Sequence, residues 1–157
     1  MVLNAVNVRL WVETLSLTAQ RAPQFIDITD QVAACLQRSG IASGMVVVYS
    51  KHTTAAIKIN EHEPELLKDM EAFLSRLSPA DSKYFHNDFS VRTVNMEEDE
   101  CPNGHAHCQA LLLGPSACLN VIDGKLLLGR WQHVFMAELD GPRAREISVL
   151  ILGEGGR

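Results

Sequence analysis

Six histidines give this 157-residue chain its clearest capacity for acid–base or metal chemistry. They stand in polar segments between the apolar runs, and loops on a rigid scaffold are where binding sites commonly form. His52 follows a buried-strand pattern, and His105 and His107 flank Ala106. The imidazole changes its charge near neutral pH and is the commonest metal ligand. The pattern predicts a pocket with acid–base or metal-binding capacity.

The spacing of His105 and His107 leaves two interpretations open. In an extended chain the two side chains share a face and can hold one ion. In a helix that starts at Asn103 they point about 200° apart and serve as cap and surface residues. Asn103-Gly104 also predicts a helix start whose unpaired N–H groups can receive a phosphate.

Two further polar groups carry both a chemical and a structural interpretation. His52 with the hydroxyls of Thr53 and Thr54 suits a phosphate or a metal-bound water, whereas a turn needs the same residue types. Glu61 and Glu63 precede a helix; we interpret Glu63 as its cap and leave Glu61 open between capping and chemistry. The acidic run 97–100 is interpreted as a solvated loop, with Mg²⁺ binding through Asp99 as the alternative.

Composition excludes several functional classes. The net charge of −5 and the pI of about 5.6 argue against nucleic acid and anionic membranes as partners. No apolar run approaches the roughly 20 residues of a membrane span. Four cysteines without a Cys-x-x-Cys pair predict reduced thiols and a cytoplasmic protein. No phosphate-binding Gly-rich loop, dinucleotide motif, zinc-protease motif or nucleophile elbow occurs, and no organic cofactor is predicted.

The elements that must position these residues follow from hydrophobic periodicity. Val8, Leu10 and Val12 alternate with polar residues, which is typical of a half-buried strand starting at Val6. Helical spacing predicts helices from Asp27 or Asp30 to 38, over 64–77 and over 104–113. Further strands are predicted at 45–49, 55–59, 117–122, 125–128, 131–139 and 146–152, with a frayed tail at 153–157. The segment before the acidic run is predicted to be mostly loop, with at most a short irregular strand within 89–94. The pattern predicts one α+β domain over 1–157, with a largely antiparallel sheet and about three helices.

Six blocks of residues, in order along the chain, resemble the signatures of the YjbQ family, also called the secondary thiamine-phosphate synthase family. They are the segments 52–56, 60–64, 103–107, 112–116, 129–132 and 138–143, with the sequences HTTAA, NEHEP, NGHAH, LLGPS, GRWQ and ELDGPR.

The resemblance implies a compact α+β homotrimer whose polar blocks gather in one pocket. It also implies a weak or secondary thiamine-phosphate synthase activity, a transferase reaction on phosphorylated small molecules. Carried over by residue, it places His52, Glu61, His105 and His107 in catalysis. The three histidines among them are the expected ligands of a divalent metal, Mg²⁺ or Zn²⁺. Thr53, Asn103, Trp131 and Gln132 are the expected substrate-binding residues, and His133 is not counted among the ligands.

Two classes of function therefore remain open. The first is a phosphate-handling enzyme with a histidine-rich, metal-dependent pocket. The second is a non-catalytic regulatory module that uses the same pocket to bind a metal or a phosphorylated metabolite.

Overall fold

Eight strands in two antiparallel sheets and three α-helices make up the part of the chain that the computed structural model describes, residues 7–155. The predicted α+β class with a largely antiparallel sheet is confirmed. Val6, where the first strand was expected to start, lies outside the described residues. No helix within 7–155 combines the length and apolar character needed to cross a bilayer.

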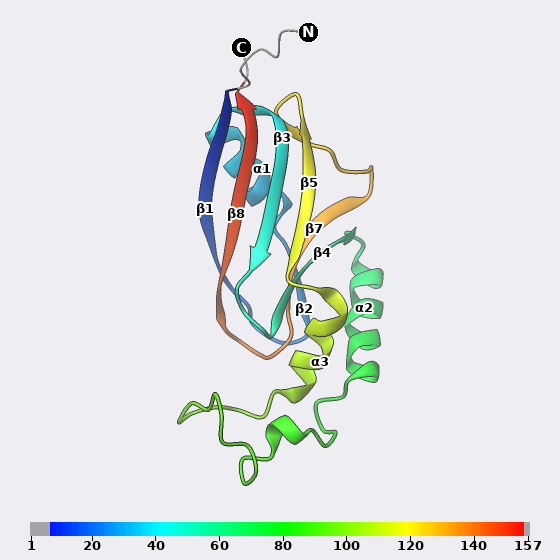
Figure 1. Cartoon of the computed structure of the whole chain (residues 1–157). Coiled ribbons are helices and arrows are strands. Elements are labelled where there is room, and N and C mark those ends of the chain that lie inside the picture. Colours follow the sequence, from blue (N-terminus) through cyan, green and yellow to red (C-terminus); the bar gives the residue numbers. More distant parts are fainter. Residues whose placement is uncertain (1–6, 156–157) are drawn as a thin grey trace, which may run out of the picture.

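The larger sheet has the strand order β1-β8-β3-β5-β6, so the first and last strands of the chain pair along their whole length. Figure 1 shows these strands standing side by side, with α1 behind them. The five strands are β1 (Val8–Thr18), β3 (Ile41–Ser50), β5 (Ser116–Ile122), β6 (Lys125–Leu126) and β8 (Ala144–Gly155).

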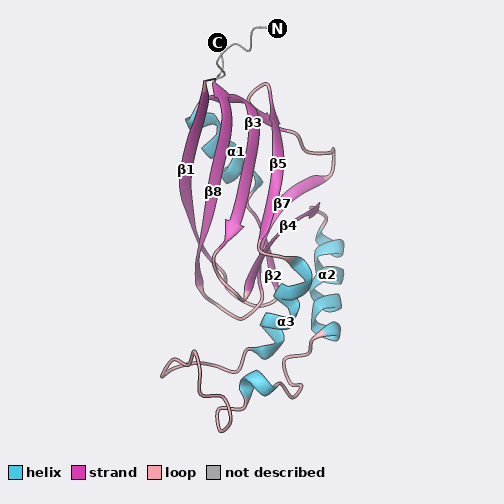
Figure 2. Ribbon diagram, viewed as in Figure 1, coloured by secondary structure: helices cyan, strands magenta, loops and turns pink. Residues whose placement is uncertain are grey.

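The smaller sheet has the order β2-β7-β4, with β7 in the centre. Its strands are β2 (Gln24–Asp27), β4 (Ala55–Glu61) and β7 (Gln132–Glu138). The helices α2 and α3 lie together beside this sheet, and a long loop with one 3-10 turn, η1, joins them (Figure 2). The helical segments are α1 (Thr29–Ser39), α2 (Pro64–Leu77), α3 (Gly104–Leu113) and η1 (Phe85–Asn87).

The main core lies between the two sheets and α1. Val46 and Val48 from β3 and Ile147 and Val149 from β8 are fully buried and pack there against Val32 of α1. A second, smaller cluster, which includes Ala56, Leu74, Ala106, Ala137 and Leu139, joins α2 and α3 to the small sheet. Apolar side chains therefore hold the strands in the core, and polar residues at the strand ends are available to form a binding site.

The helices follow the predicted periodicity closely. Both α2 and α3 have the predicted bounds, and α1 ends at Ser39, directly before Gly40, whose φ of 64° is the left-handed conformation that glycine adopts readily. Glu63 caps α2 as expected, because its carboxylate accepts the backbone N–H groups of Glu65 and Leu66. The Asp123-Gly124 turn joins β5 to β6, with φ values of 50° and 70°.

The structure settles three details of the strands. Residues 89–94 form no strand, because Asp88 and Arg92 hold this segment in turns. The tail is not frayed at 153–155, since β8 continues to Gly155 in pairing with β3. The short strand β2 was missed because four residues are too few to show a period.

Candidate functional site

A groove of about 370 Å³ lies where β3 ends and α3 faces the link from β3 to β4. Three of the residues predicted from the sequence, His52, Thr53 and His107, come together in it. The complete lining is Tyr49, Ser50, Lys51, His52, Thr53, Ala55, His107, Ala110, Leu111 and Pro115. Among the described residues, the groove brings together side chains from three of the blocks, 52–56, 103–107 and 112–116.

His52 is fixed by a backbone contact. Its Nε2 atom accepts the backbone N–H of Glu146 at 3.0 Å, which links the β3–β4 connection to β8. Burial, followed by the positive charge of Arg145, holds the pKa of His52 below its usual value. An Nε2 that accepts must carry no proton, so the neutral ring carries its proton on Nδ1 and can donate it to a ligand.

His107 projects from the first half of α3 and packs against a second histidine. Its ring meets that of His86, from η1, edge to face with 4.6 Å between the ring centroids. Burial, followed by His86, lowers the pKa of His107. Both imidazoles in the groove are therefore neutral at pH 7 and act there as hydrogen-bonding groups.

His105 does not join them. Residues 104–113 are helical, so the rings of His105 and His107 diverge as the helical alternative requires. The ring of His105 lies near Tyr84 at 6.5 Å between centroids, and its Nδ1 is buried without a hydrogen-bond partner. Within residues 7–155 of one chain, His52, His105 and His107 do not form a group that can share a metal ion. Their catalytic and metal-binding roles stay predictions.

Asn103 supports the start of α3 differently from the expected cap. Its side chain makes no capping hydrogen bond; the amide donates to Asp140 at 3.2 Å. The backbone N–H of Gly104 is instead taken by Asn87 at 2.8 Å. A Cβ on Gly104 would lie 2.6 Å from that of Tyr84, so only glycine permits this close approach.

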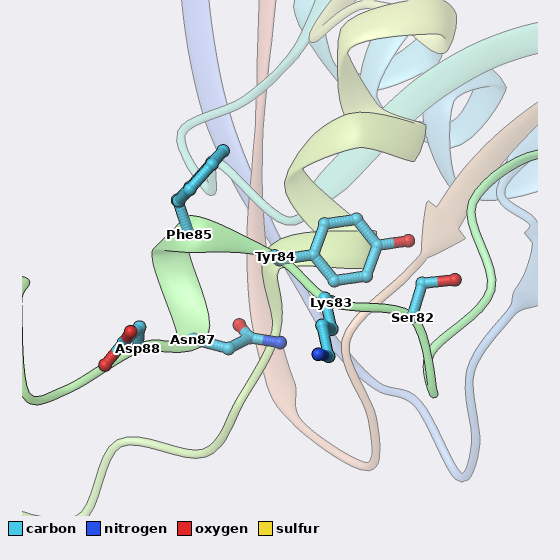
Figure 3. A pocket seen from close by; sticks show the side chains of 6 residues that line it. All are labelled: Ser82, Lys83, Tyr84, Phe85, Asn87 and Asp88. Carbon is cyan, nitrogen blue, oxygen red and sulfur yellow. The ribbon is translucent and has the colours of Figure 1, made fainter.

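The hollow beside this helix start is a feature of the η1 loop. It measures about 600 Å³ and is lined by Ser82, Lys83, Tyr84, Phe85, Asn87 and Asp88. Figure 3 shows Phe85 directed away from the other side chains, and its ring is 98% exposed. The Tyr84 hydroxyl and the Asn87 amide already bond Pro79 and Gly104. Glu100, the last residue of the acidic run 97–100, stabilises the same loop through an ion pair with Arg92 at 2.5 Å.

Glu61, Trp131 and Gln132 lie at the other end of the small sheet. Glu61 and Gln132 are register partners where β4 ends and β7 begins. The length of β4 separates them from His52 by roughly 20 Å. Trp131 is 58% exposed and covered by the guanidinium of Arg130 at 4.4 Å from the ring centroid. One chain does not bring these residues to the groove, and their roles in binding or catalysis stay predictions.

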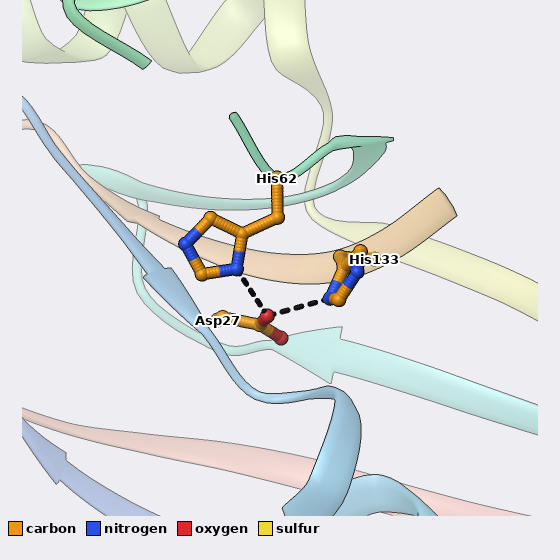
Figure 4. A group of neighbouring side chains, drawn as sticks. All are labelled: Asp27, His62 and His133. Carbon is orange, nitrogen blue, oxygen red and sulfur yellow. Dashed lines mark hydrogen bonds and ion pairs between the residues drawn. The ribbon is translucent and has the colours of Figure 1, made fainter. Parts of the chain in front are cut away.

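At the same end of the small sheet, Asp27, His62 and His133 form a cluster that the sequence analysis did not predict. The Oδ2 atom of Asp27 lies 2.8 Å from Nδ1 of His62 and 2.7 Å from Nδ1 of His133. Figure 4 shows both rings directed at this one carboxylate. The three side chains come from the end of β2, the residue after β4 and the start of β7. Among the described residues this is the one group of three metal-ligating side chains whose ligand atoms all lie within 4.8 Å of one another.

The carboxylate of this cluster is held by its neighbours. Burial alone would raise the pKa of Asp27, but hydrogen bonds from the side chain and backbone of Thr29, and then from His62 and His133, keep it below its usual value. Thr29 donates to Oδ1 through Oγ1 at 2.6 Å and through its backbone N–H at 2.9 Å. Asp27 is therefore an ionised and well-oriented ligand at neutral pH.

Sequence reasoning had little chance of finding this cluster. The sequence places Asp27 at a predicted helix start, His62 inside the block 60–64, and His133 directly after the block 129–132 and outside all six blocks. The available signal was that each histidine borders a strand end, and the antiparallel pairing of β4 with β7 brings those ends together.

The fold and the groove define a class: a small α+β protein with two antiparallel sheets and, at the strand ends, a groove lined by both polar and apolar side chains. Residues 13–154 match the model of the family described as UPF0047 protein YjbQ-like. The chain belongs to this family, which confirms the resemblance seen in the sequence.

Relatives cover nearly the whole chain. A UPF0047 protein of Methanothermobacter thermautotrophicus is 41% identical over 145 residues, 92% of this chain and 94% of the relative. The UPF0047 protein YugU of Bacillus subtilis is 33% identical, over 90% of this chain and 98% of that protein. The crystal structure of a YbjQ-like protein of unknown function from Sulfolobus solfataricus is 35% identical, covers 94% of this chain and 100% of that one, and has a TM-score of 0.85.

The comparisons correct the expected activity. The relatives are named only as UPF0047 proteins or as proteins of unknown function. Nothing in them points to a thiamine-phosphate synthase, so the expected transferase activity, and with it the expectation of an enzyme, is wrong. The regulatory alternative gains no support from these names either.

Proposed function

We propose that the protein binds a small phosphorylated ligand in the groove beside His52 and His107. The composition of the lining carries this proposal. Lys51 supplies a cation, and Thr53 and the two imidazoles supply hydrogen bonds. No carboxylate occurs among the described residues that line the groove, although the chain as a whole has a net charge of −5. A phosphate would meet these donors, and it would take the place of the Glu146 carboxylate, which lies 3.4 Å from Lys51 Nζ, as the partner of that cation.

The hydrogen bond of His52 adds a directional donor. Because Nε2 is occupied by the Glu146 N–H, the proton on Nδ1 is the one that the ring can offer. A bound phosphate also favours the protonated form of His107, whose pKa is low without a ligand. Phosphate should therefore bind more tightly as the pH falls toward 6.

Titration calorimetry with inorganic phosphate and with pyrophosphate tests the proposal. Each of Lys51→Gln and His107→Gln should weaken binding by about tenfold or more, the value of a hydrogen bond to a charged group. Lys68→Gln is the matched control, because this exposed lysine on α2 forms an ion pair with Glu65 and does not line the groove. Absence of binding by the wild type, or equal losses in the control, would refute the proposal.

A second proposal concerns assembly. We propose that the outer face of the large sheet is the contact between copies in a homotrimer. Exposed hydrophobic side chains from three neighbouring strands gather on this face, away from the core; they are Val8, Leu10, Val12, Met45, Tyr49 and Leu152. Apolar patches of this kind are uncommon on monomers. Tyr49 also lines the groove, so a neighbouring copy would lie beside the proposed ligand.

We also propose a cytoplasmic location. Its support is chemical: Cys35, Cys101, Cys108 and Cys118 are free thiols, the usual state in a reducing compartment. Cell fractionation with thiol labelling would test it, and disulfide-linked protein from freshly lysed cells would speak against it.

A further inference from the structure

We propose that Asp27, His62 and His133 bind one divalent first-row transition metal ion, with Zn²⁺ as the reference ion. This site is separate from the phosphate groove. It offers one carboxylate oxygen and two imidazole nitrogens, all within 4.8 Å of one another. Two histidines and one carboxylate are a donor set that suits Zn²⁺ and its neighbours in the first transition row.

The present spacing is close to that of a loaded site. With bonds of about 2.1 Å, two ligand atoms on a tetrahedral zinc ion lie roughly 3.4 Å apart. The two distances from Asp27 Oδ2 are 2.8 and 2.7 Å, so the rings need to withdraw by only a fraction of an ångström. Both Nδ1 atoms now face a shared oxygen as hydrogen-bond partners. For metal binding each Nδ1 must give up the hydrogen that it shares with the carboxylate and present a lone pair, and the neutral ring then carries its single proton on Nε2.

The surroundings of Asp27 resemble the supporting shell of a metal ligand. Its second oxygen, Oδ1, is held by both donors of Thr29, which leaves Oδ2 to face the histidines. The Thr29 hydroxyl in turn accepts the backbone N–H of Val134 at 2.9 Å, next to His133. Outer hydrogen bonds of this kind fix the direction of a ligand and tune its affinity.

The site is open to solvent on one side and closed on the other. The side chains of His62 and His133 are 41% and 38% exposed, so an ion can enter. The buried ring of Phe135 lies 5.5 Å from the His62 ring and forms the floor. Three protein ligands leave a fourth position for water or an exogenous group. The ion would also tie together one end of all three strands of the small sheet.

Titration of the full-length protein, freed of metal by a chelator, provides the test. Calorimetry with Zn²⁺ should give one site per chain, and Co²⁺ should give the visible absorption of a site with nitrogen and oxygen ligands. His62→Ala and His133→Ala should each weaken Zn²⁺ binding by about 100-fold or more. Thr29→Val should weaken it by about 10- to 100-fold, and Thr29→Ser, which keeps the hydroxyl, should restore most of the affinity.

Two controls keep the result specific to these residues. Asp30→Asn removes one negative charge three residues from Asp27 without removing a ligand, and it should leave Zn²⁺ binding within twofold of the wild type. The exposed position of His62 makes His62→Ala the variant expected to fold, which circular dichroism verifies.

Three outcomes would each overturn the proposal. They are the absence of a one-to-one site, equal Zn²⁺ affinities of the wild type and His62→Ala, and loss of Zn²⁺ binding in His107→Ala instead. Phosphate binding in His62→Ala should be unchanged, which separates this site from the groove.

Discussion

Glu138 and Arg145 form an ion pair in the interior, with side chains 0% and 6% exposed. The guanidinium also donates to the hydroxyl of Thr54, and the carboxylate accepts backbone N–H groups from the turn after β7. Arg145→Met should lower the free energy of unfolding by roughly 3–5 kcal/mol, because it leaves Glu138 as a buried charge without a partner. Urea denaturation followed by circular dichroism measures the loss.

An exposed ion pair nearby serves as its control. Lys51 lies 3.4 Å from Glu146, and both side chains are more than half exposed. Lys51→Met should change the free energy of unfolding by less than about 1 kcal/mol, since water screens this pair. Equal losses in the two variants would show that burial of the Arg145 pair is not what matters.

The stability of the fold should depend on the state of His52. Its pKa is lowered in the folded protein, so between its unfolded value of 6.5 and the lower folded value the unfolded chain binds more protons. The free energy of unfolding should therefore fall as the pH drops through 6.5, and His107 should add to the same slope. Urea denaturation at a series of pH values measures this slope.

The variant His52→Gln tests the origin of that slope. Glutamine can still accept the Glu146 N–H but does not titrate, so the slope below pH 6.5 should become shallower. The lowered pKa of Asp27 acts in another window, because its contribution is present above 3.8 and is lost as the pH falls through the lower folded value. An unchanged slope near pH 6 in His52→Gln would contradict the assignment.

Single side chains were predictable from the sequence where local chemistry decides. Glu63 was recognised as a cap because capping involves only the next three residues. His52 and His107 were recognised as site candidates, and they do share a groove. The cluster of Asp27 with His62 and His133 depends on which strands pair, and no local pattern carries that information.

At the scale of elements, the backbones of the paired strands β3 and β8 approach each other so closely at one point that only glycine fits there. Gly44 and Gly153 are register partners there, and a Cβ on Gly44 would lie 2.1 Å from the carbonyl oxygen of Leu152. Gly44→Ala should lower the free energy of unfolding by about 1–3 kcal/mol or more, because backbone cannot yield as a side chain can. Thermal unfolding measures the loss.

Gly141 provides the matched control for this substitution. A Cβ there would meet no atom within 4 Å. Gly141→Ala should therefore stay within about 0.5 kcal/mol of the wild type. A similar loss of stability in both variants would show that the loss of glycine's backbone flexibility, and not the close approach of β3 and β8, is the cause.

The elements themselves were predictable in proportion to their length and period. Residues 64–77 repeat apolar side chains over fourteen positions, and α2 has the predicted bounds. The four residues of β2 show no period, and their position depends on pairing with β7. The length of β8 was underestimated because Gly153 and Gly155 weaken a strand pattern, while the close crossing with β3 requires glycine at Gly153.

At the scale of the whole molecule, the arrangement of the sheets decides which residues meet. Pairing of β1 with β8 brings Val8 opposite Glu154, and the central place of β7 brings His133 to the end of β4. The same topology keeps Glu61 and Gln132 at one end of the small sheet and His52 near the other. The sequence blocks predicted a single pocket, whereas one chain separates them into a groove and a distant strand end.

The exposed face of the large sheet should govern assembly. Leu152 pairs with Leu10 on one side and with Met45 on the other, so it lies at the centre of the apolar patch. If this face forms the proposed trimer, Leu152→Glu should convert it to monomers, because a buried unpaired carboxylate is costly in an interface. Native mass spectrometry and light scattering measure the mass. Phe85→Glu, which replaces a ring that is 98% exposed on the η1 loop, should leave the mass unchanged. A monomeric wild type, or dissociation caused by Phe85→Glu alone, would show that this face does not join the copies.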